Sequence, residues 1–259
     1  MELNTARQEL PKNKTILITG SSRGIGAATA KLLSSNGYSV CINYNTNESA
    51  AYELLGEITA CHGQAIVVQA DISKEKDVIR LFEETERSFG YIDGLVNNAG
   101  IISLQSTLEH MDFERIQRIF SINTIGAMIC AREAVKRMQT KNGGRGGVIV
   151  NVSTALAKSG APNLYLDYAA SKGAIETFTI GLARETADQG IRVNVIRPGM
   201  IDTEIHLSSG DPNRVQKAAT YAPMKRVGQA IEVAKAISWL ISDESSYTTG
   251  AVVDVSGGV

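Results

Sequence analysis

The chain has 259 residues, of which 43% are hydrophobic and 20% charged, and its formal net charge is -1. This composition excludes a disordered chain, and the balanced charge gives no electrostatic footprint for nucleic acid. No apolar run approaches the ~20 residues that span a bilayer. Residues 1–14 are polar and lack the apolar core of a secretory signal, so we expect a cytoplasmic protein with no membrane partner.

Cysteines and histidines are few and scattered, which argues against a disulfide framework and against a metal site. They are Cys41, Cys61, Cys130, His62, His110 and His206. We expect the cysteines to act as small buried hydrophobic residues, and we expect no metal-dependent chemistry.

Short β-branched runs recur along the chain and predict seven strands. These cover residues 15–19, 39–43, 65–69, 94–97, 148–152, 192–196 and 251–255. Continuous apolar runs of this kind are typical of parallel strands that are buried on both faces.

Segments with helical periodicity lie between the predicted strands. They cover residues 27–35, 76–89, 109–138, 169–187 and 231–241. Alternating strands and helices indicate right-handed crossovers and a doubly wound parallel sheet with helices on both faces. We expect one α/β domain over residues 13–259, preceded by a flexible extension of residues 1–12.

Glycines follow the first predicted strand directly. Residues 20–26 read GSSRGIG, and a predicted helix begins at Ala27. Glycine lets the backbone turn tightly and approach a pyrophosphate, and a helix N-terminus offers unpaired N–H groups with partial positive charge. A glycine triplet alone fits a plain turn equally well, but between a first strand and a helix it indicates a dinucleotide site.

The glycine spacing differs from the G-x-G-x-x-G of the general dinucleotide fingerprint. The chain instead resembles the short-chain dehydrogenase/reductase family at four motifs in the family's order. They are TGxxxGxG at residues 19–26, NNAG at 97–100, YxxxK at 168–172 and PG at 198–199. The resemblance spans about residues 14–258. It implies a Rossmann fold and an oxidoreductase that interconverts a carbonyl and an alcohol with a nicotinamide cofactor.

The end of the second strand selects the cofactor in this family. A carboxylate there would bind the ribose 2′-hydroxyl of NAD and repel the 2′-phosphate of NADP. This chain has Asn43, Tyr44 and Asn45, with no acid before Glu48. NADP-dependent members place a basic residue at the position of Arg23, and a guanidinium suits a phosphate. We expect NADP(H), with a solvated Arg23 and NAD(H) as the alternative.

The resemblance assigns further residues to the cofactor. Asp71 is expected to meet the adenine amine beside the Ile72 backbone, although Asp71 would equally suit the start of a helix. The Ile201 backbone is expected to meet the nicotinamide carboxamide, and Thr203 the amide or a phosphate. The full expected set is Gly20, Ser22, Arg23, Gly24, Ile25, Gly26, Asn43, Tyr44, Asn45, Asp71, Ile72, Asn98, Ala99, Gly100, Tyr168, Lys172, Pro198, Gly199, Ile201 and Thr203.

Tyr168 and Lys172 form the expected chemical centre. A spacing of four places both side chains on one helix face. A phenol titrates near pH ~10, and a nearby ammonium favours the phenolate and lowers that pKa. Tyr168 could then exchange a proton with a carbonyl or an alcohol near neutral pH. Tyr221 and Lys225 have the same spacing, but Pro223 between them argues against a continuous helix.

The resemblance adds a hydroxyl residue after the fifth strand and an asparagine to the catalytic set. Ser153 and Thr154 both fit the hydroxyl position, and we favour Thr154 because the family uses the second of the pair, although it lies one residue farther from Tyr168 than is usual. Asn123 matches the family asparagine that holds a water beside the lysine, with a solvent-facing asparagine as the alternative.

Substrate choice is expected to depend on residues 156–165 and on a polar, turn-rich lid at about residues 202–226. Candidate pocket residues are Ile101, Leu156, Tyr165, Met200, His206, Tyr221 and Met224. They leave sugars, 3-oxoacyl thioesters and other ketones or aldehydes open as substrates. The alternative function is a catalytically silent protein that senses NADP(H).

The resemblance also implies a homotetramer. One contact would pair the helices at about residues 112–138 and 169–187, and another would use the last strand. Small residues that would allow close helix approach are Gly126, Ala127, Ala131, Ala174 and Gly181. The alternative is that these residues pack only within the subunit.

Overall fold

The protein is described here by a computed structural model that covers residues 14–211 and 213–259. Seven parallel strands form one sheet in the order β3-β2-β1-β4-β5-β6-β9, which confirms the predicted fold class. They are β1 (Thr15–Ile18), β2 (Ser39–Tyr44), β3 (Gln64–Gln69), β4 (Gly94–Asn97), β5 (Gly147–Val152), β6 (Ile191–Pro198) and β9 (Val252–Val255). A second, two-stranded sheet pairs β7 (Ile201–Asp202) with β8 (Gly228–Gln229). The predicted extension, residues 1–12, lies outside the described residues.

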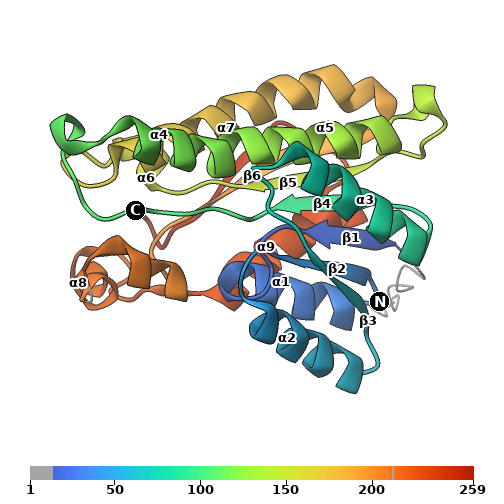
Figure 1. Ribbon diagram of the computed structural model, residues 1–259, viewed down its shortest axis with the longest axis horizontal. Helices are drawn as coiled ribbons and strands as arrows, with labels where there is room; N and C mark the ends of the chain where they lie inside the picture. Colours follow the sequence, from blue (N-terminus) through green and yellow to red (C-terminus); the bar gives the residue numbers. More distant parts are fainter. Residues whose placement is uncertain (1–13, 212) are drawn as a thin grey trace, which may run out of the picture.

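Helices cover both faces of the large sheet (Figure 1). One face carries α1 (Gly24–Ser35), α2 (Glu48–Ala60) and α9 (Ala230–Ile241), and the other carries α3 (Glu75–Phe89), α5 (Ala127–Met138) and α7 (Leu166–Thr186). Three shorter helices are α4 (Phe113–Phe120), α6 (Leu156–Ser159) and α8 (Arg214–Tyr221). Of these, α8 lies away from the helices that cover the sheet, within the segment expected to form a lid. The sequence patterns did not single out α2.

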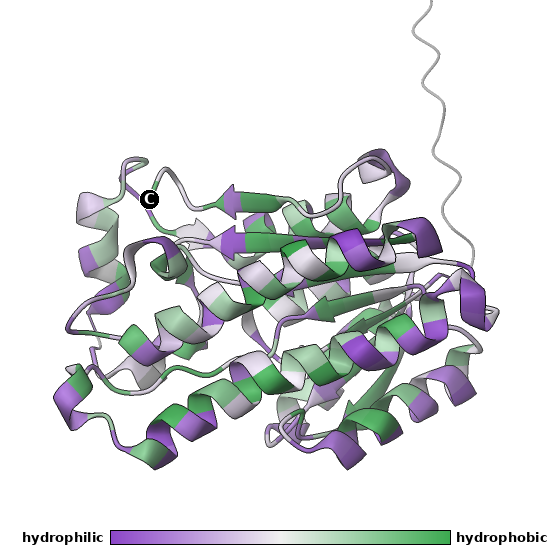
Figure 2. Ribbon diagram, turned by 90° about the horizontal axis from the view of Figure 1, so that it is seen from above, coloured by the Kyte–Doolittle hydropathy of each residue, from purple (hydrophilic) through white to green (hydrophobic). Residues whose placement is uncertain are grey.

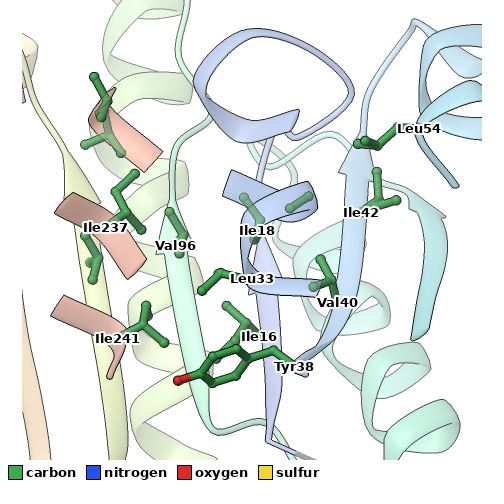
Figure 3. Packing of buried hydrophobic residues seen from close by; sticks show 14 of the residues in the cluster. Ile16, Ile18, Leu33, Tyr38, Val40, Ile42, Leu54, Val96, Ile237 and Ile241 are labelled. Atoms are coloured by element: carbon green, nitrogen blue, oxygen red, sulfur yellow. The ribbon is translucent and has the colours of Figure 1, made fainter. Parts of the chain in front are cut away.

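Two apolar clusters, one on each face of the sheet, explain the uninterrupted apolar strands. Ile16 and Ile18 of β1 pack with Leu33 of α1 on one face (Figure 3). Leu17, which lies between them in the sequence, packs with Phe82 of α3 on the other face. Burial of each such side chain stabilises the fold by roughly 1.5–3 kcal/mol. Figure 2 shows the resulting pattern, with hydrophobic colour along the strands and mixed colour along the covering helices.

The long helix predicted over residues 109–138 begins later, at Phe113, and is not a regular α-helix throughout, although it continues without a break to Met138. The segment contains a short 3₁₀ turn at Leu108–His110, then α4, then a π-helical stretch at Ser121–Gly126 that leads into α5. Side chains inside the π-helical stretch bond to neighbouring elements, as Thr124 Oγ1 does by donating to the Ser171 carbonyl at 3.0 Å. The wider turns bring those side chains toward α7, and such stretches often occur at functional sites.

Candidate active site

The topology of the sheet places a crevice beyond the carboxyl ends of β1 and β4. The chain runs from β1 through β2 to β3 on one side, and β4 begins the other side. Ligands of open α/β sheets bind at such a switch point. The loops that follow the two strands are joined, because Asn98 Nδ2 donates to the Gly20 carbonyl at 2.9 Å and Ala99 N donates to Thr19 Oγ1 at 3.1 Å.

The glycine loop allows backbone approaches that other residues would block. Gly20 has φ +60°, and a Cβ added there would lie 2.8 Å from the Ala99 Cα. Gly24 has φ +58°, and its Cβ would lie 3.3 Å from the Thr203 methyl group. The helix α1 begins directly at Gly24, and its N-cap residue Arg23 makes no side-chain cap. The loop therefore fits a phosphate group, which would accept from the first N–H groups of α1.

The end of β2 supports the glycine loop from within the protein. Asn43 is buried, its Oδ1 accepts from the Gly20 N–H at 3.0 Å, and its Nδ2 donates to the Ala70 carbonyl at 3.1 Å. The Asn43 side chain is therefore occupied by bonds to the protein backbone. Asn45, two residues farther along, is exposed at the surface. Arg23 is exposed and has no ion pair among residues 14–211 and 213–259.

Asp71 follows β3 and lies in the turn before α3, although Lys74 and not Asp71 is the N-cap of that helix. Its expected contact with adenine stays a prediction. Asp71 Oδ1 accepts from the Ser73 hydroxyl at 2.7 Å and from the Ser73 N–H at 3.0 Å, which fixes the turn before α3. Burial raises the pKa of Asp71, but the bonds from Ser73 and the charge of Lys74 outweigh burial and hold the pKa below its usual range. The carboxylate therefore stays ionised at the edge where adenine is expected.

Tyr168 lies in the first turn of α7 and is held there by a buried ion pair. Its N–H donates to Asp167 Oδ1 at 2.9 Å, and the other oxygen of Asp167 accepts from Arg115 Nε at 2.7 Å. The Arg115 side chain comes from α4, so two helices fix the start of α7. The phenol is 9% exposed.

Lys172 lies one helical turn after Tyr168, on the same face. Its Nζ donates to the Val152 carbonyl at the end of β5, at 2.7 Å, and burial lowers its pKa to about 8. Gly100 of the NNAG segment makes room for it, because a Cβ at Gly100 would lie 3.3 Å from Nζ. The ammonium is therefore buried without a carboxylate partner in the described part of the chain, yet charged at neutral pH.

The expected lowering of the Tyr168 pKa by Lys172 is wrong for this structure. Burial raises the pKa of the Tyr168 phenol, and the opposing influences are a hydrogen bond with Thr154 and the charge of Arg214. The Lys172 ammonium bonds to a backbone carbonyl instead. The net result is a neutral phenol at pH 7, which is the protonation state of a general acid.

The two candidate hydroxyl residues after β5 occupy different environments. Ser153 Oγ donates to Glu176 Oε1 at 2.6 Å, and Glu176 in turn accepts from Arg197 Nη2 at 2.6 Å. The Thr154 hydroxyl instead forms a hydrogen bond with the Tyr168 phenol, and its oxygen accepts a hydrogen bond from the Leu156 N–H at 3.3 Å. The structure therefore brings the Thr154 hydroxyl to the Tyr168 phenol, whereas the Ser153 hydroxyl bonds to Glu176.

Asn123 lies in the π-helical stretch and is buried, so the solvent-facing alternative is excluded. Its Oδ1 accepts from the Ile101 N–H at 2.8 Å, and its Nδ2 donates to the Ile101 carbonyl at 2.9 Å and to Ser171 Oγ at 3.1 Å. A Cβ at Gly100 would lie 3.4 Å from Asn123 Oδ1. Asn123 thus borders the same space as Lys172.

Comparisons with known proteins agree with this geometry. Residues 20–259 match the family model described as enoyl-(acyl carrier protein) reductase. The chain is 53% identical to the uncharacterized oxidoreductase YgfF of Escherichia coli (strain K12), over 93% of this chain and 98% of that protein. The chain belongs to the short-chain dehydrogenase/reductase family. It is therefore an oxidoreductase of carbonyl and alcohol groups, and the family implies a nicotinamide cofactor.

Other relatives extend the likeness over most of the fold. The chain is 38% identical to glucose 1-dehydrogenase 2 of Bacillus subtilis (strain 168), over 95% of this chain and 94% of that protein. A crystal structure of a dehydrogenase/reductase from Sinorhizobium meliloti 1021 superposes with a TM-score of 0.87 at 28% identity and covers 95% of each chain. Within residues 14–211 and 213–259, no helix is long and apolar enough to cross a membrane.

Sequence reasoning missed two ion pairs that support this short-chain dehydrogenase/reductase site, Arg115 with Asp167 and Arg197 with Glu176. A signal for Glu176 was available, since it lies four residues after Lys172 and thus on the same face of α7. Arg115 and Arg197 carry no such local signal, because they reach α7 from α4 and β6.

The segment expected to form the lid contains more regular structure than its turn-rich sequence suggests. A 3₁₀-helical stretch at Glu204–Ser209 precedes α8, and α8 ends at Tyr221. Lys225 has φ +54°, so Tyr221 and Lys225 do not share a helix, as predicted. Among the candidate pocket residues, Tyr221 and Met224 are exposed, whereas Tyr165 is 2% exposed and packs with Tyr168.

His206 connects this segment to the cofactor side. Its Nε2 lies 2.7 Å from the Ile201 carbonyl, and its Nδ1 is buried with no hydrogen-bond partner among the described residues. Burial lowers the pKa of His206. The ring is therefore neutral at pH 7, with Nε2–H donating and Nδ1 available as an acceptor.

Proposed function

We propose that the protein reduces carbonyl compounds with NADPH, and that Tyr168 is the general acid. The observation that carries the proposal is the meeting of Tyr168, Thr154 and Lys172 at the carboxyl end of β5. Bound NADPH would supply a hydride to the carbonyl carbon. The neutral phenol of Tyr168 would give its proton to the carbonyl oxygen, and in the reverse direction it would take that proton back.

The other residues orient the carbonyl and the cofactor. Thr154 Oγ1 would donate a hydrogen bond to the carbonyl oxygen beside Tyr168 and so fix its position. Lys172 has two donors left after its bond to Val152, and these would hold a ribose hydroxyl of the cofactor. Asn123 would keep a proton path open beside Lys172. The glycine loop and Thr203 would hold the pyrophosphate.

NADP(H) is proposed as the cofactor on the basis of charge. Arg23 is exposed at the start of α1, and the side chains at the end of β2 are neutral. Glu48 is the nearest acid along the chain, and its Oε1 accepts from the Tyr44 hydroxyl at 3.3 Å. A guanidinium without an acidic partner would favour a 2′-phosphate over a bare ribose.

The decisive experiment measures oxidation of NADPH and NADH by the purified protein against a panel of sugars, oxoacyl thioesters, ketones and aldehydes. We expect at least one carbonyl compound to be reduced, with NADPH preferred. Tyr168→Phe should lower kcat by roughly 10²–10⁴-fold while NADPH still binds. NADPH binding without turnover of any substrate in the panel would favour the sensing protein, and unchanged turnover in Tyr168→Phe would refute the proposed acid.

A homotetramer is proposed as the assembled form. Exposed apolar side chains lie along α4, the π-helical stretch and α7, where Phe113, Ile125 and Ile180 are 70%, 49% and 37% exposed. Of the small residues expected at this contact, Gly126, Ala127 and Ala131 are buried within the subunit. Light scattering should return a tetramer for the parent and a smaller species for Ile180→Asp, whereas Tyr52→Asp on α2 should leave the mass unchanged. A monomeric parent at micromolar concentration would refute it.

A further inference from the structure

Arg214, the first residue of α8, is stacked on a fixed aromatic ring beside the proposed catalytic site. Its guanidinium carbon lies 4.4 Å from the centre of the Tyr165 ring. Tyr165 is 2% exposed, its hydroxyl donates to the Ser209 carbonyl at 3.0 Å, and it accepts from Gln105 Nε2 at 3.1 Å. A cation over such a ring is held in place by stacking and by the charge distribution of the ring.

One nitrogen of this guanidinium lacks a partner. Arg214 Nη1 is buried and makes no hydrogen bond to any described residue. A buried donor without a partner destabilises a protein, and it does so more strongly when the group is charged. Buried polar groups are nearly always satisfied, so an unpartnered one requires an explanation such as a bound ligand or water.

Arg214 also lies close to the reactive phenol. Tyr165, on which it stacks, belongs to the same apolar cluster as Tyr168 and Ile102. Its positive charge acts on the titration of both Tyr168 and His206. The guanidinium therefore lies on a residue that packs with Tyr168, near the place where a carbonyl substrate would bind.

Three of the carboxylates near this space each have another cation, whereas Asp202, whose charge acts on His206, forms no ion pair with any described residue. Asp167 is paired with Arg115, and Glu176 is paired with Arg197. Asp211, which is near enough to sense the charge of Arg214, has its Oδ2 2.9 Å from Lys217 Nζ. Within the described chain, no salt bridge involves Arg214 or Lys172. This arrangement leaves two positive charges beside the site.

We infer that Arg214 binds a carboxylate of the substrate, so that the preferred substrate is an oxo acid. A monoanion fits better than a phosphate dianion, because the neighbouring His206 is neutral and its Nδ1 is an acceptor, so it would not balance a second negative charge. The same Nδ1 would accept from a hydroxyl group of the substrate. The inference rests on the proposed function, because it places the carboxylate in the same cleft as the carbonyl that Tyr168 protonates.

The test compares acids with their neutral esters. Acetoacetate, 4-oxopentanoate and 2-oxobutanoate are assayed against their methyl esters with NADPH, and binding of 4-oxopentanoate and its ester to the NADP⁺-bound protein is measured by calorimetry. We expect the acid to be favoured over the ester at least tenfold, both in affinity and, where turnover occurs, in kcat/KM. In Arg214→Gln the ratio should fall to near one. Lys225→Gln, which removes an exposed lysine of the same segment that forms no ion pair with any described residue, should leave the ratio unchanged.

The outcomes separate this inference from the proposed function. Turnover of esters and acids at equal efficiency would overturn the role of Arg214 and leave carbonyl reduction intact. Acid binding that depends on Arg214, without reduction of any carbonyl compound, would support the carboxylate site and count against the proposed reaction. Equal affinity for acid and ester in the parent, or a preference for neutral hydroxyketones such as dihydroxyacetone, would overturn the inference whether or not turnover is seen.

Discussion

The cofactor end and the substrate end of the cleft are built in different ways. At the cofactor end, backbone groups meet at close range, as where Gly20 lies against Ala99 and the Asn98 amide bonds to the Gly20 carbonyl. At the substrate end, side chains make the surface. Arg214 and His206 each have a buried nitrogen without a hydrogen-bond partner among the described residues, and Met224 is 59% exposed.

This difference separates what the two ends can recognise. A backbone cradle without side chains fits a group that is the same in every reaction, such as a pyrophosphate. Side chains on a helix such as α8, held by few contacts, can differ from one family member to the next without disturbing the sheet. We therefore expect the cofactor end to carry the chemistry shared by the family and the substrate end to carry the choice of substrate.

The largest expected effect comes from filling the backbone cradle. In Gly20→Val, the new side chain meets Ala99 and a β-branched residue adopts φ +60°. Strain and overpacking should lower the free energy of unfolding by about 2–5 kcal/mol, measured in urea, and NADPH binding should be lost. Gly56→Ala on α2, where a Cβ meets no atom within 4 Å, should instead raise stability by roughly 0.5–1 kcal/mol. A Gly20→Val protein that binds NADPH as the parent does would show that the loop is not a close cradle.

Substitutions of Ser153 and Thr154 test whether one hydroxyl serves the reaction and the other the stability of the fold, as their contacts suggest. Thr154→Ala should lower kcat by roughly 10²–10³-fold, because it removes a donor to the carbonyl oxygen. Thr154→Ser, which keeps the hydroxyl, should restore most of the rate. Ser153→Ala should instead destabilise the fold by about 1.5–3 kcal/mol, because Glu176 loses its bond from Ser153. The reverse order of rates would move the substrate contact to Ser153.

The same contrast explains what the sequence alone could predict. The seven strands and the glycine loop are local patterns, in which residues adjacent in the chain determine the geometry. The π-helical stretch around Asn123 was not predictable in this way, because it depends on bonds to Ile101 and Ser171. Arg214 was missed for the same reason, since its significance comes from stacking on Tyr165, which is far away in sequence.

Asn43 shows that a motif can be identified correctly while the role of a side chain within it is not. Its position at the end of β2 suggested a cofactor contact, but its side chain bonds to the backbone of the glycine loop and of the segment after β3. The choice between Ser153 and Thr154 likewise required the location of Glu176, which becomes apparent only when α7 is packed against β5.

Stability as a function of pH tests the burial of Lys172. Its pKa is about 8 in the folded protein against 10.5 in the unfolded chain. Between these pH values the unfolded chain binds more protons, so the free energy of unfolding of the cofactor-free parent should rise with pH relative to Lys172→Met, by at most about 3 kcal/mol. Urea unfolding at several pH values measures the difference. Lys172→Arg keeps its charge over this pH range, so its free energy of unfolding should not rise with pH relative to Lys172→Met. If the parent showed the same flat pH dependence as Lys172→Arg, the lowered pKa of a buried Lys172 would be refuted.

The smallest effect is expected at the outer edge of the cofactor end, where the exposed Arg23 side chain, and not the backbone, would contact the cofactor. Arg23→Ala should weaken NADPH binding by about 1–3 kcal/mol, the range for hydrogen bonds to charged groups. Binding of NADH should be unchanged, because it lacks the 2′-phosphate. Lys31→Ala removes another exposed cation of α1, one that is paired with Glu57, and should alter neither affinity. Because Arg23 is exposed, its contribution should shrink as salt rises, whereas affinity that arises from the glycine backbone should persist. Equal loss of NADPH and NADH affinity in Arg23→Ala would mean that Arg23 acts on the shared pyrophosphate, and the cofactor preference would then need another source.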